Sequence, residues 1–128
     1  MSSREGKMIA KHIMSKNVET VTPETSLADA VNILLMREIS GMPVVDGEGY
    51  LMGVVSERDV FRLAFSGKIH ESKVADVMTT KIVTFPPDAD IRDIAKVLGE
   101  NIFRTVPILE NGKIVGIVSR ADILKVAL

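Results

Sequence analysis

This 128-residue sequence contains no cysteine, no excess of charge of one sign and no long apolar run. The absence of cysteine excludes disulfides, thiol catalysis and zinc–thiolate sites, and it fits a reducing cytoplasm. Sixteen Lys and Arg residues against 17 Asp and Glu residues leave a formal net charge of -1, which argues against nucleic acid or an anionic membrane as a partner. No apolar run approaches the roughly 18 residues of a membrane span, and the first residues carry no signal-peptide hydrophobic region. We therefore expect a cytoplasmic protein without a membrane segment.

The most informative feature that the sequence does have is an internal repeat. The stretch from Ile13 to Phe65 aligns with the stretch from Val77 to Leu128 at a spacing of about 64 residues, with a gap of one residue in the second copy. Identical pairs are Met14 and Met78, Thr20 and Thr84, Pro23 and Pro87, Asp29 and Asp93, Pro43 and Pro107, Gly53 and Gly116, Ser56 and Ser119, and Asp59 and Asp122. One copy is too short to bury a comfortable core alone, so we expect two packed copies with the functional surface between them.

Both copies show the same order of local patterns. Apolar positions at helical spacing predict a short helix over residues 8–13 and another over 74–78. β-rich runs at 18–22 and 82–85 end at proline and predict short strands. Amphipathic helices follow from Leu27 and from Ile91, then hairpins with turns at 46–49 and 110–112, then closing helices over 60–65 and 123–128. The predicted fold class is α/β of the α+β type, a pseudo-two-fold tandem of β-α-β-β-α repeats packed sheet to sheet.

Few residues suggest catalysis or metal binding. Gly47, Gly49 and Gly53 are followed by a strand rather than a helix, which favours a hairpin turn over a phosphate-binding loop. The two histidines, His12 and His70, lie far apart and have no acidic or histidine neighbour at metal-ligand spacing. The sequence shows no nucleophile elbow, zinc-helix signature or evident Ser/His/Asp set. We expect no enzyme activity, no metal site and no required cofactor.

Two Ser-x-x-Asp motifs, Ser56 to Asp59 and Ser119 to Asp122, stand immediately before apolar helical runs. Serine followed three residues later by an acid is a helix capping box, and Ser26 with Asp29 shows the same pattern where no site is expected. A helix N-terminus can also bind a phosphate through its backbone N–H groups, and a carboxylate one turn in can accept hydrogen bonds from ribose hydroxyls. Capping and ligand binding are compatible, so both interpretations stay open at this point.

The motifs resemble those of cystathionine-β-synthase (CBS) domains, and the whole chain is similar to a free-standing CBS domain pair. In the first copy the resemblance rests on Thr20-Val21-Thr22-Pro23, Ser40-Gly41-Met42-Pro43-Val44-Val45-Asp46 and Gly53-Val54-Val55-Ser56-Glu57-Arg58-Asp59-Val60. In the second copy it rests on Thr84-Phe85-Pro86-Pro87, Arg104-Thr105-Val106-Pro107-Ile108-Leu109 and Gly116-Ile117-Val118-Ser119-Arg120-Ala121-Asp122-Ile123. It covers nearly everything after the first dozen residues, and it predicts CBS domains at 8–66 and 73–128.

The resemblance implies two clefts that bind adenosine-containing ligands such as AMP, ADP, ATP or S-adenosylmethionine. In the first cleft it implies an adenine set of Thr20, Thr25, Ile39 and Ser40, with Asp122 on the ribose, Ser119 and Arg104 on the phosphate, and Ile117 as the wall. In the second cleft it implies Thr84, Ala89 and Phe103 near the base, Val54 as the wall, Asp59 on the ribose, and Ser56 with Arg58 on the phosphate. Because Arg104 of the second copy corresponds to Ser40 of the first, the resemblance implies clefts that differ in phosphate affinity, and the first is the stronger candidate.

The function that the resemblance implies is a regulatory, energy-sensing module that reports ligand status to another protein of unknown identity. It also implies a homodimer, for which Phe61, Phe65, Leu124 and Leu128 could supply the contact; the alternative for these four side chains is internal core. The alternative function is an interaction or scaffold module with vestigial clefts, in which the Ser-x-x-Asp motifs serve only as caps.

Overall fold

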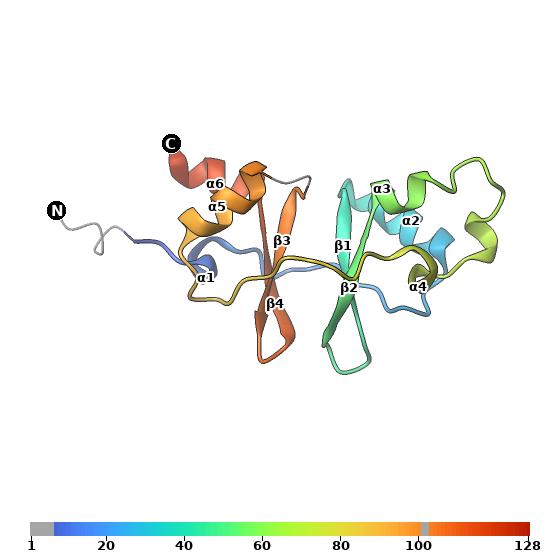
Figure 1. Ribbon diagram of the computed structural model, residues 1–128, viewed down its shortest axis with the longest axis horizontal. Coiled ribbons are helices and arrows are strands. Elements are labelled where there is room, and N and C mark those ends of the chain that lie inside the picture. Colours follow the sequence, from blue (N-terminus) through green and yellow to red (C-terminus); the bar gives the residue numbers. More distant parts are fainter. Residues whose placement is uncertain (1–6, 101–102) are drawn as a thin grey trace. The chain divides into compact units, whose positions relative to one another are not determined.

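The computed structural model describes residues 7–100 and 103–128 and divides into two compact units (Figure 1). We call residues 19–82 the first-copy unit, and the described residues of 7–18 and 83–128 the second-copy unit. Each unit contains one two-stranded antiparallel sheet with its own helices and its own hydrophobic core. This confirms the predicted α+β class.

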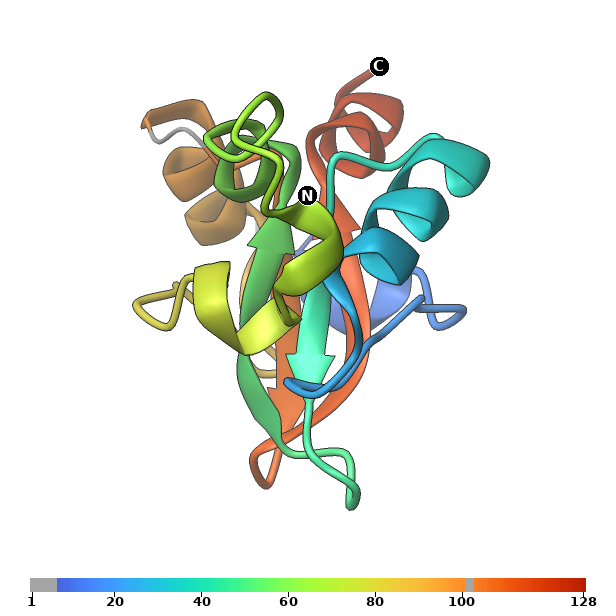
Figure 2. The same ribbon diagram turned by 90° about the vertical axis from the view of Figure 1, so that its right-hand side faces the viewer.

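The first-copy unit is organised around a hairpin of β1 (Gly41–Val45) and β2 (Leu51–Ser56). Its helices are α2 (Leu27–Arg37), the five-residue α3 (Glu57–Phe61) and α4 (Val74–Val77), with a short 3₁₀ helix, η1, at Ile69–Glu71. Figure 2 shows α2 and α3 at the end of the hairpin opposite its turn. The apolar face of α2 packs on the hairpin, and the core consists of Val21, Leu27, Ala30, Leu34, Met42, Val44, Val55, Val60 and Val74.

The second-copy unit repeats this plan with different side chains. Its hairpin joins β3 (Thr105–Glu110) to β4 (Lys113–Ser119), and its helices are α1 (Ala10–Ile13), α5 (Ile91–Glu100) and α6 (Arg120–Ala127). The core consists of Ala10, Ile94, Leu98, Val106, Ile108 and Val118. The two hairpins, the two amphipathic helices and the closing helices therefore lie in the order that the repeat predicted.

The short helix that precedes each copy packs in the unit of the other copy. Helix α4 comes before the second copy in sequence but belongs to the first-copy unit, and α1 belongs to the second-copy unit. Each is followed by a residue that pairs with the second strand of the hairpin: Thr79 with Val54 on β2, and Ser15 with Ile117 on β4. The domain boundaries 8–66 and 73–128 follow the repeats along the sequence and stay a prediction. In the compact units, the first helix of each repeat packs with the other repeat.

The predicted strands at 18–22 and 82–85 are each reduced to one bridged residue, Val21 beside Val44 and Phe85 beside Ile108. Prolines explain why pairing stops there. The Val21 N–H donates to the Pro43 carbonyl at 3.2 Å, and the Val45 N–H donates to the Val21 carbonyl at 2.8 Å. The next bonds of a parallel ladder would need N–H groups on Pro43 and Pro23, which proline lacks. Phe85 is bounded in the same way by Pro107 and Pro87.

The closing helix of the first copy is shorter and earlier than predicted. Helix α3 begins at Glu57, directly after the Ser56 cap, and ends at Phe61, whereas we predicted helix over 60–65. Beyond it the N–H groups of Leu63 and Ala64 donate to carbonyls three residues back, which gives tight turns instead of further α-helix.

Helix α5 is preceded by an acid held by a nearby arginine. The Arg92 guanidinium donates to Asp90 at 2.7 Å, and the Arg92 backbone N–H donates to the same carboxylate at 2.9 Å. These hydrogen bonds stabilise the ionised form of the acid, so they lower the pKa of Asp90 from 3.8 to about 2.

Candidate functional site

The Ser56–Asp59 motif forms a complete capping box at the start of α3. The Asp59 backbone N–H donates to Ser56 Oγ at 3.3 Å, and Asp59 Oδ2 accepts from the Ser56 N–H at 2.9 Å and from the Ser56 hydroxyl at 3.0 Å. Both side chains are half-buried. The motif is therefore a structural cap, as its spacing predicted, and its carboxylate lies close to the serine.

The second oxygen of the same carboxylate has a partner that the sequence did not suggest. Thr79, which follows helix α4, donates its hydroxyl to Asp59 Oδ1 at 2.9 Å. Two backbone hydrogen bonds hold Thr79 beside Val54, at 2.9 Å and 2.8 Å. The sequence does single out the position, because the repeat aligns Thr79 with Ser15 and each follows one of the paired methionines, but it does not show the contact with Asp59.

The Ser119–Asp122 motif caps α6 in the same way but leaves more of its carboxylate available. Asp122 Oδ2 accepts from the Ser119 N–H at 2.8 Å, and the Asp122 N–H donates to Ser119 Oγ at 3.1 Å. Within the described residues, Asp122 Oδ1 accepts no hydrogen bond. The carboxylate of Asp122 thus keeps an oxygen that could accept a ligand hydroxyl.

The third motif of this type, Ser26 to Asp29, is only a one-way cap. Ser26 Oγ accepts from the Asp29 N–H at 3.1 Å, but the structure shows no return bond from the exposed Asp29 side chain to the Ser26 N–H within the described residues. The two candidate motifs therefore differ from the ordinary cap in holding their carboxylates close to the serine.

The other candidate residues of the first-copy unit lie on several elements. The Ser40 carbonyl accepts from the Glu57 N–H at 2.8 Å, so Ser40 adjoins the start of α3. The Thr25 hydroxyl accepts from the Thr22 N–H at 3.1 Å. Thr20 and Val54 are half-buried, Ile39 packs against the core, and Arg58 is exposed.

In the second-copy unit, Arg104 occupies the position that matches Ser40. Its carbonyl accepts from the Arg120 N–H at 3.1 Å, so its exposed side chain starts beside the N-terminus of α6. The Arg120 guanidinium donates to the Leu98 carbonyl at 3.0 Å and is thereby directed toward α5. The remaining candidates, Thr84, Ala89, Phe103 and Ile117, are half-buried.

Each predicted cleft takes its residues from both units. For the first cleft, the ribose and phosphate set of Arg104, Ile117, Ser119 and Asp122 belongs to the second-copy unit, and its adenine set belongs to the first-copy unit. The structure brings Arg104, Ser119 and Asp122 to the same end of one hairpin. The complete clefts stay a prediction.

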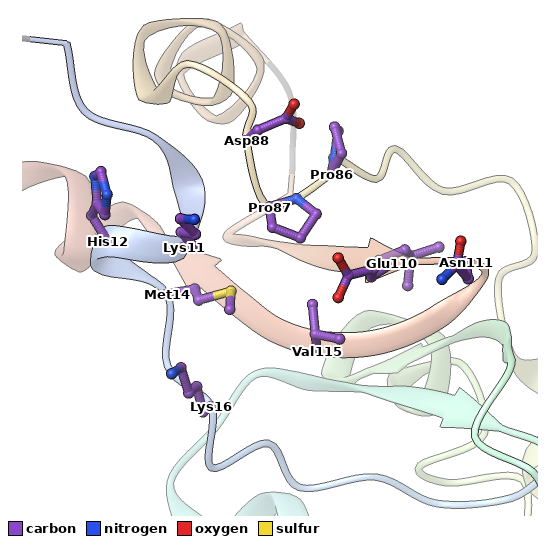
Figure 3. A pocket seen from close by; sticks show the side chains of 11 residues that line it. Lys11, His12, Met14, Lys16, Pro86, Pro87, Asp88, Glu110, Asn111 and Val115 are labelled. Carbon is purple, nitrogen blue, oxygen red and sulfur yellow. The ribbon is translucent and has the colours of Figure 1, made fainter.

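A groove of about 780 Å³ on the second-copy unit contains none of the candidate residues (Figure 3). It lies between α1, the Pro86–Asp88 segment and the turn of the β3–β4 hairpin, and Lys11, His12 and Glu110 are among its polar side chains. Among the residues that the structure describes, no group of three His, Asp or Glu side chains could hold a metal ion. No helix in the described part of the chain has the length and apolar character needed to span a membrane.

The comparison with known families identifies the repeat. The CBS domain family matches the sequence twice, over residues 10–66 and 74–128. The chain is a tandem pair of CBS domains. The resemblance inferred from the two sets of motifs is confirmed.

Known CBS-pair structures have the same fold. The crystal structure of CBSX2 from Arabidopsis thaliana matches with a TM-score of 0.87 and 28% identity, over 93% of both chains. A crystal structure of CBSX2 in complex with AMP matches with a TM-score of 0.85 and 30% identity, over 93% of this chain and 95% of that one.

Two relatives found by sequence comparison are longer than this chain. MJ1225 of Methanocaldococcus jannaschii is 32% identical over 116 residues, which is 90% of this chain but 41% of that protein. The inosine-5'-monophosphate dehydrogenase of the same organism is 33% identical over 117 residues, 91% of this chain and 23% of the enzyme. The CBS pair thus spans less than half the length of these two relatives.

Proposed function

We propose that this CBS pair is a regulatory module that binds an adenosine-containing ligand, with Asp122 as the principal ribose contact. One observation carries the proposal: CBSX2, which is 30% identical over 93% of this chain, has been crystallised in complex with AMP. The Asp122 carboxylate supports it from within the chain, because Ser119 fixes its position while Oδ1 stays available among the described residues.

The N-terminus of α6 has the chemistry needed for the phosphate. The first N–H groups of a helix have no intrahelical acceptor and carry partial positive charge. Here the Arg120 N–H donates to the Arg104 carbonyl, and the Asp122 N–H donates to Ser119 Oγ. A phosphate placed there would meet the Ser119 hydroxyl, the nearby Arg104 side chain and the Ala121 N–H, which is among the first N–H groups of the helix.

The adenine contacts in this proposal are Thr20, Thr25, Ile39 and Ser40, with Ile117 as the wall. For a second cleft the family resemblance implies Thr84, Ala89, Phe103, Val54, Ser56, Arg58 and Asp59, but the Asp59 carboxylate already accepts three hydrogen bonds within its own unit. We propose a sensor, with no catalytic activity, that acts on another protein in the cytoplasm.

A homodimer is part of the same proposal. In the first-copy unit Phe61 and Phe65 are 76% and 98% exposed, and in the second-copy unit Leu124 is 65% exposed. The alternative that these side chains form internal core is therefore wrong. Large apolar side chains left in water favour association, which sedimentation velocity would measure.

The ligand class can be tested by calorimetric titration of the purified chain with AMP, ADP, ATP, S-adenosylmethionine and GTP at fixed salt. We expect one or more adenosine ligands to bind and GTP to bind more weakly. Asp122→Ala removes charge-assisted hydrogen bonds of about 1.5–3 kcal/mol, so affinity should fall roughly ten- to a hundred-fold. Unchanged affinity in that variant would refute the ribose assignment.

A second candidate function is an interaction module without a ligand. It is favoured by the completeness of both capping boxes, which explains the four Ser and Asp residues without any ligand. In that case no member of the panel would raise the melting temperature, and Ser119→Ala would cost only the cap, about 1 kcal/mol.

A further inference from the structure

The two Ser-x-x-Asp motifs differ in how their carboxylates are used. In the first-copy unit Asp59 accepts three hydrogen bonds, two on Oδ2 from Ser56 and one on Oδ1 from Thr79. In the second-copy unit the described residues give Asp122 one donor, the Ser119 N–H on Oδ2. The difference therefore centres on Thr79 and on its counterpart Ser15.

Thr79 is fixed where its hydroxyl meets Asp59. Its N–H donates to the Val54 carbonyl at 2.8 Å, and its carbonyl accepts from the Val54 N–H at 2.9 Å. A Cβ added at Gly53 would lie 2.7 Å from the Thr79 carbonyl oxygen, so the backbone segments at Gly53 and Thr79 are in close contact. A β-branched side chain has few χ1 states, which keeps the hydroxyl directed at the carboxylate.

Ser15 occupies the matching place in the second-copy unit without making the matching bond. Its backbone pairs with Ile117 at 2.9 Å and 3.0 Å, as Thr79 pairs with Val54. Its side chain is exposed, and in the described part of the chain its hydroxyl donates no hydrogen bond to Asp122. Serine lacks the methyl group that limits rotation of threonine, so its hydroxyl is not held.

We infer that Thr79 and Asp59 form a structural latch that ties the α4 segment to the capped start of α3, and that one adenosine ligand per chain binds, at Asp122. The inference rests on the proposed function for its ligand half. Ser56 and Thr79 use three of the roughly four acceptor positions of the Asp59 carboxylate, whereas the described residues leave Oδ1 of Asp122 unused, so a ribose that donates both of its hydroxyls finds enough acceptor positions only at Asp122. We therefore expect the adenosine ligand at Asp122 and not at Asp59, and Thr79 is the residue that distinguishes the two motifs.

Calorimetric titration with AMP tests the ligand half. We expect one AMP per chain in the wild type and in the cap variant Asp29→Ala, and a loss of at least tenfold in affinity in Asp122→Ala. Two AMP molecules per chain, or an affinity in Asp122→Ala equal to that of the wild type, would overturn the inference.

A double-mutant cycle between Asp59 and Thr79 tests the latch without any ligand. Thr79→Val should lower the folded-to-unfolded ratio roughly tenfold in the wild-type background and much less in the Asp59→Ala background, because the bond goes to an ionised acid. Thr79→Ser should recover part of the loss, and the matched Ser15→Ala should leave stability unchanged. If AMP fails to bind at all, the proposed function fails but the cycle still decides the latch: equal effects of Thr79→Val in both backgrounds would refute it.

Discussion

Replacing Gly53 with alanine would test how closely the α4 segment packs on β2. A Cβ at this position would lie 2.7 Å from the Thr79 carbonyl oxygen and 3.3 Å from Met78 Sδ. Real Cβ atoms do not approach another heavy atom within 3.0 Å, and the atom in the way is backbone held by two hydrogen bonds. Either β2 or the segment at Thr79 must move.

Overpacking of this kind costs about 1–3 kcal/mol. At roughly 4 °C for each kcal/mol in a chain of this size, Gly53→Ala should lower the melting temperature by about 4–12 °C. Gly116→Ala should cost less, because the atoms in the way there belong to the flexible Met14 side chain. Gly47→Ala is the matched control, since a Cβ at Gly47 has nothing within 4 Å.

Thermal melts followed by far-UV circular dichroism would rank the three variants. The packing predicts that Gly53→Ala is the least stable, followed by Gly116→Ala and then Gly47→Ala. Equal melting temperatures for Gly53→Ala and Gly47→Ala would refute the close approach of the α4 segment to β2, and with it the geometry on which the Thr79 latch depends.

Three further predictions concern charge, capping and association. Because Arg92 lowers the pKa of Asp90 to about 2 in the folded state, the unfolded chain binds more protons between about pH 4 and pH 2. Stability should therefore decrease as the pH is lowered from about 4 to about 2. Asp90→Asn should flatten this part of a plot of melting temperature against pH. Ser26→Ala should cost about 1 kcal/mol in urea unfolding and leave AMP affinity unchanged, and a weaker affinity would contradict its role as a cap alone. Phe61→Asp with Phe65→Asp should shift sedimentation from dimer to monomer, and an unchanged sedimentation coefficient would place the dimer contact elsewhere.

Much of the fold could be predicted because each local sequence pattern occurs in both copies of the repeat. The two hairpins, the amphipathic helices and the short first helices all follow from periodicity and turn residues that recur in both copies. The strands at 18–22 and 82–85 could not be predicted correctly from propensity alone. Their pairing depends on N–H groups that Pro43 and Pro107 lack, and these prolines lie on a neighbouring segment distant in sequence.

The candidate site divides in the same way. The capping boxes at Ser56 and Ser119 were readable from spacing, because a cap is a local interaction over four residues. The bond from Thr79 to Asp59 joins residues 20 positions apart and depends on which unit α4 packs in. The alignment of Thr79 with Ser15 was visible in the sequence, but nothing in it shows that only one of the two hydroxyls meets a carboxylate.

The central claim is that Asp122 binds an adenosine ligand and does more than cap a helix. Calorimetric titration of AMP into Asp122→Ala and into Asp29→Ala tests this most directly, since both variants remove the acid of a Ser-x-x-Asp motif and only one motif is assigned a ligand. The account predicts a roughly ten- to hundred-fold weaker affinity in Asp122→Ala and wild-type affinity in Asp29→Ala. Equal affinity in the two variants would contradict it.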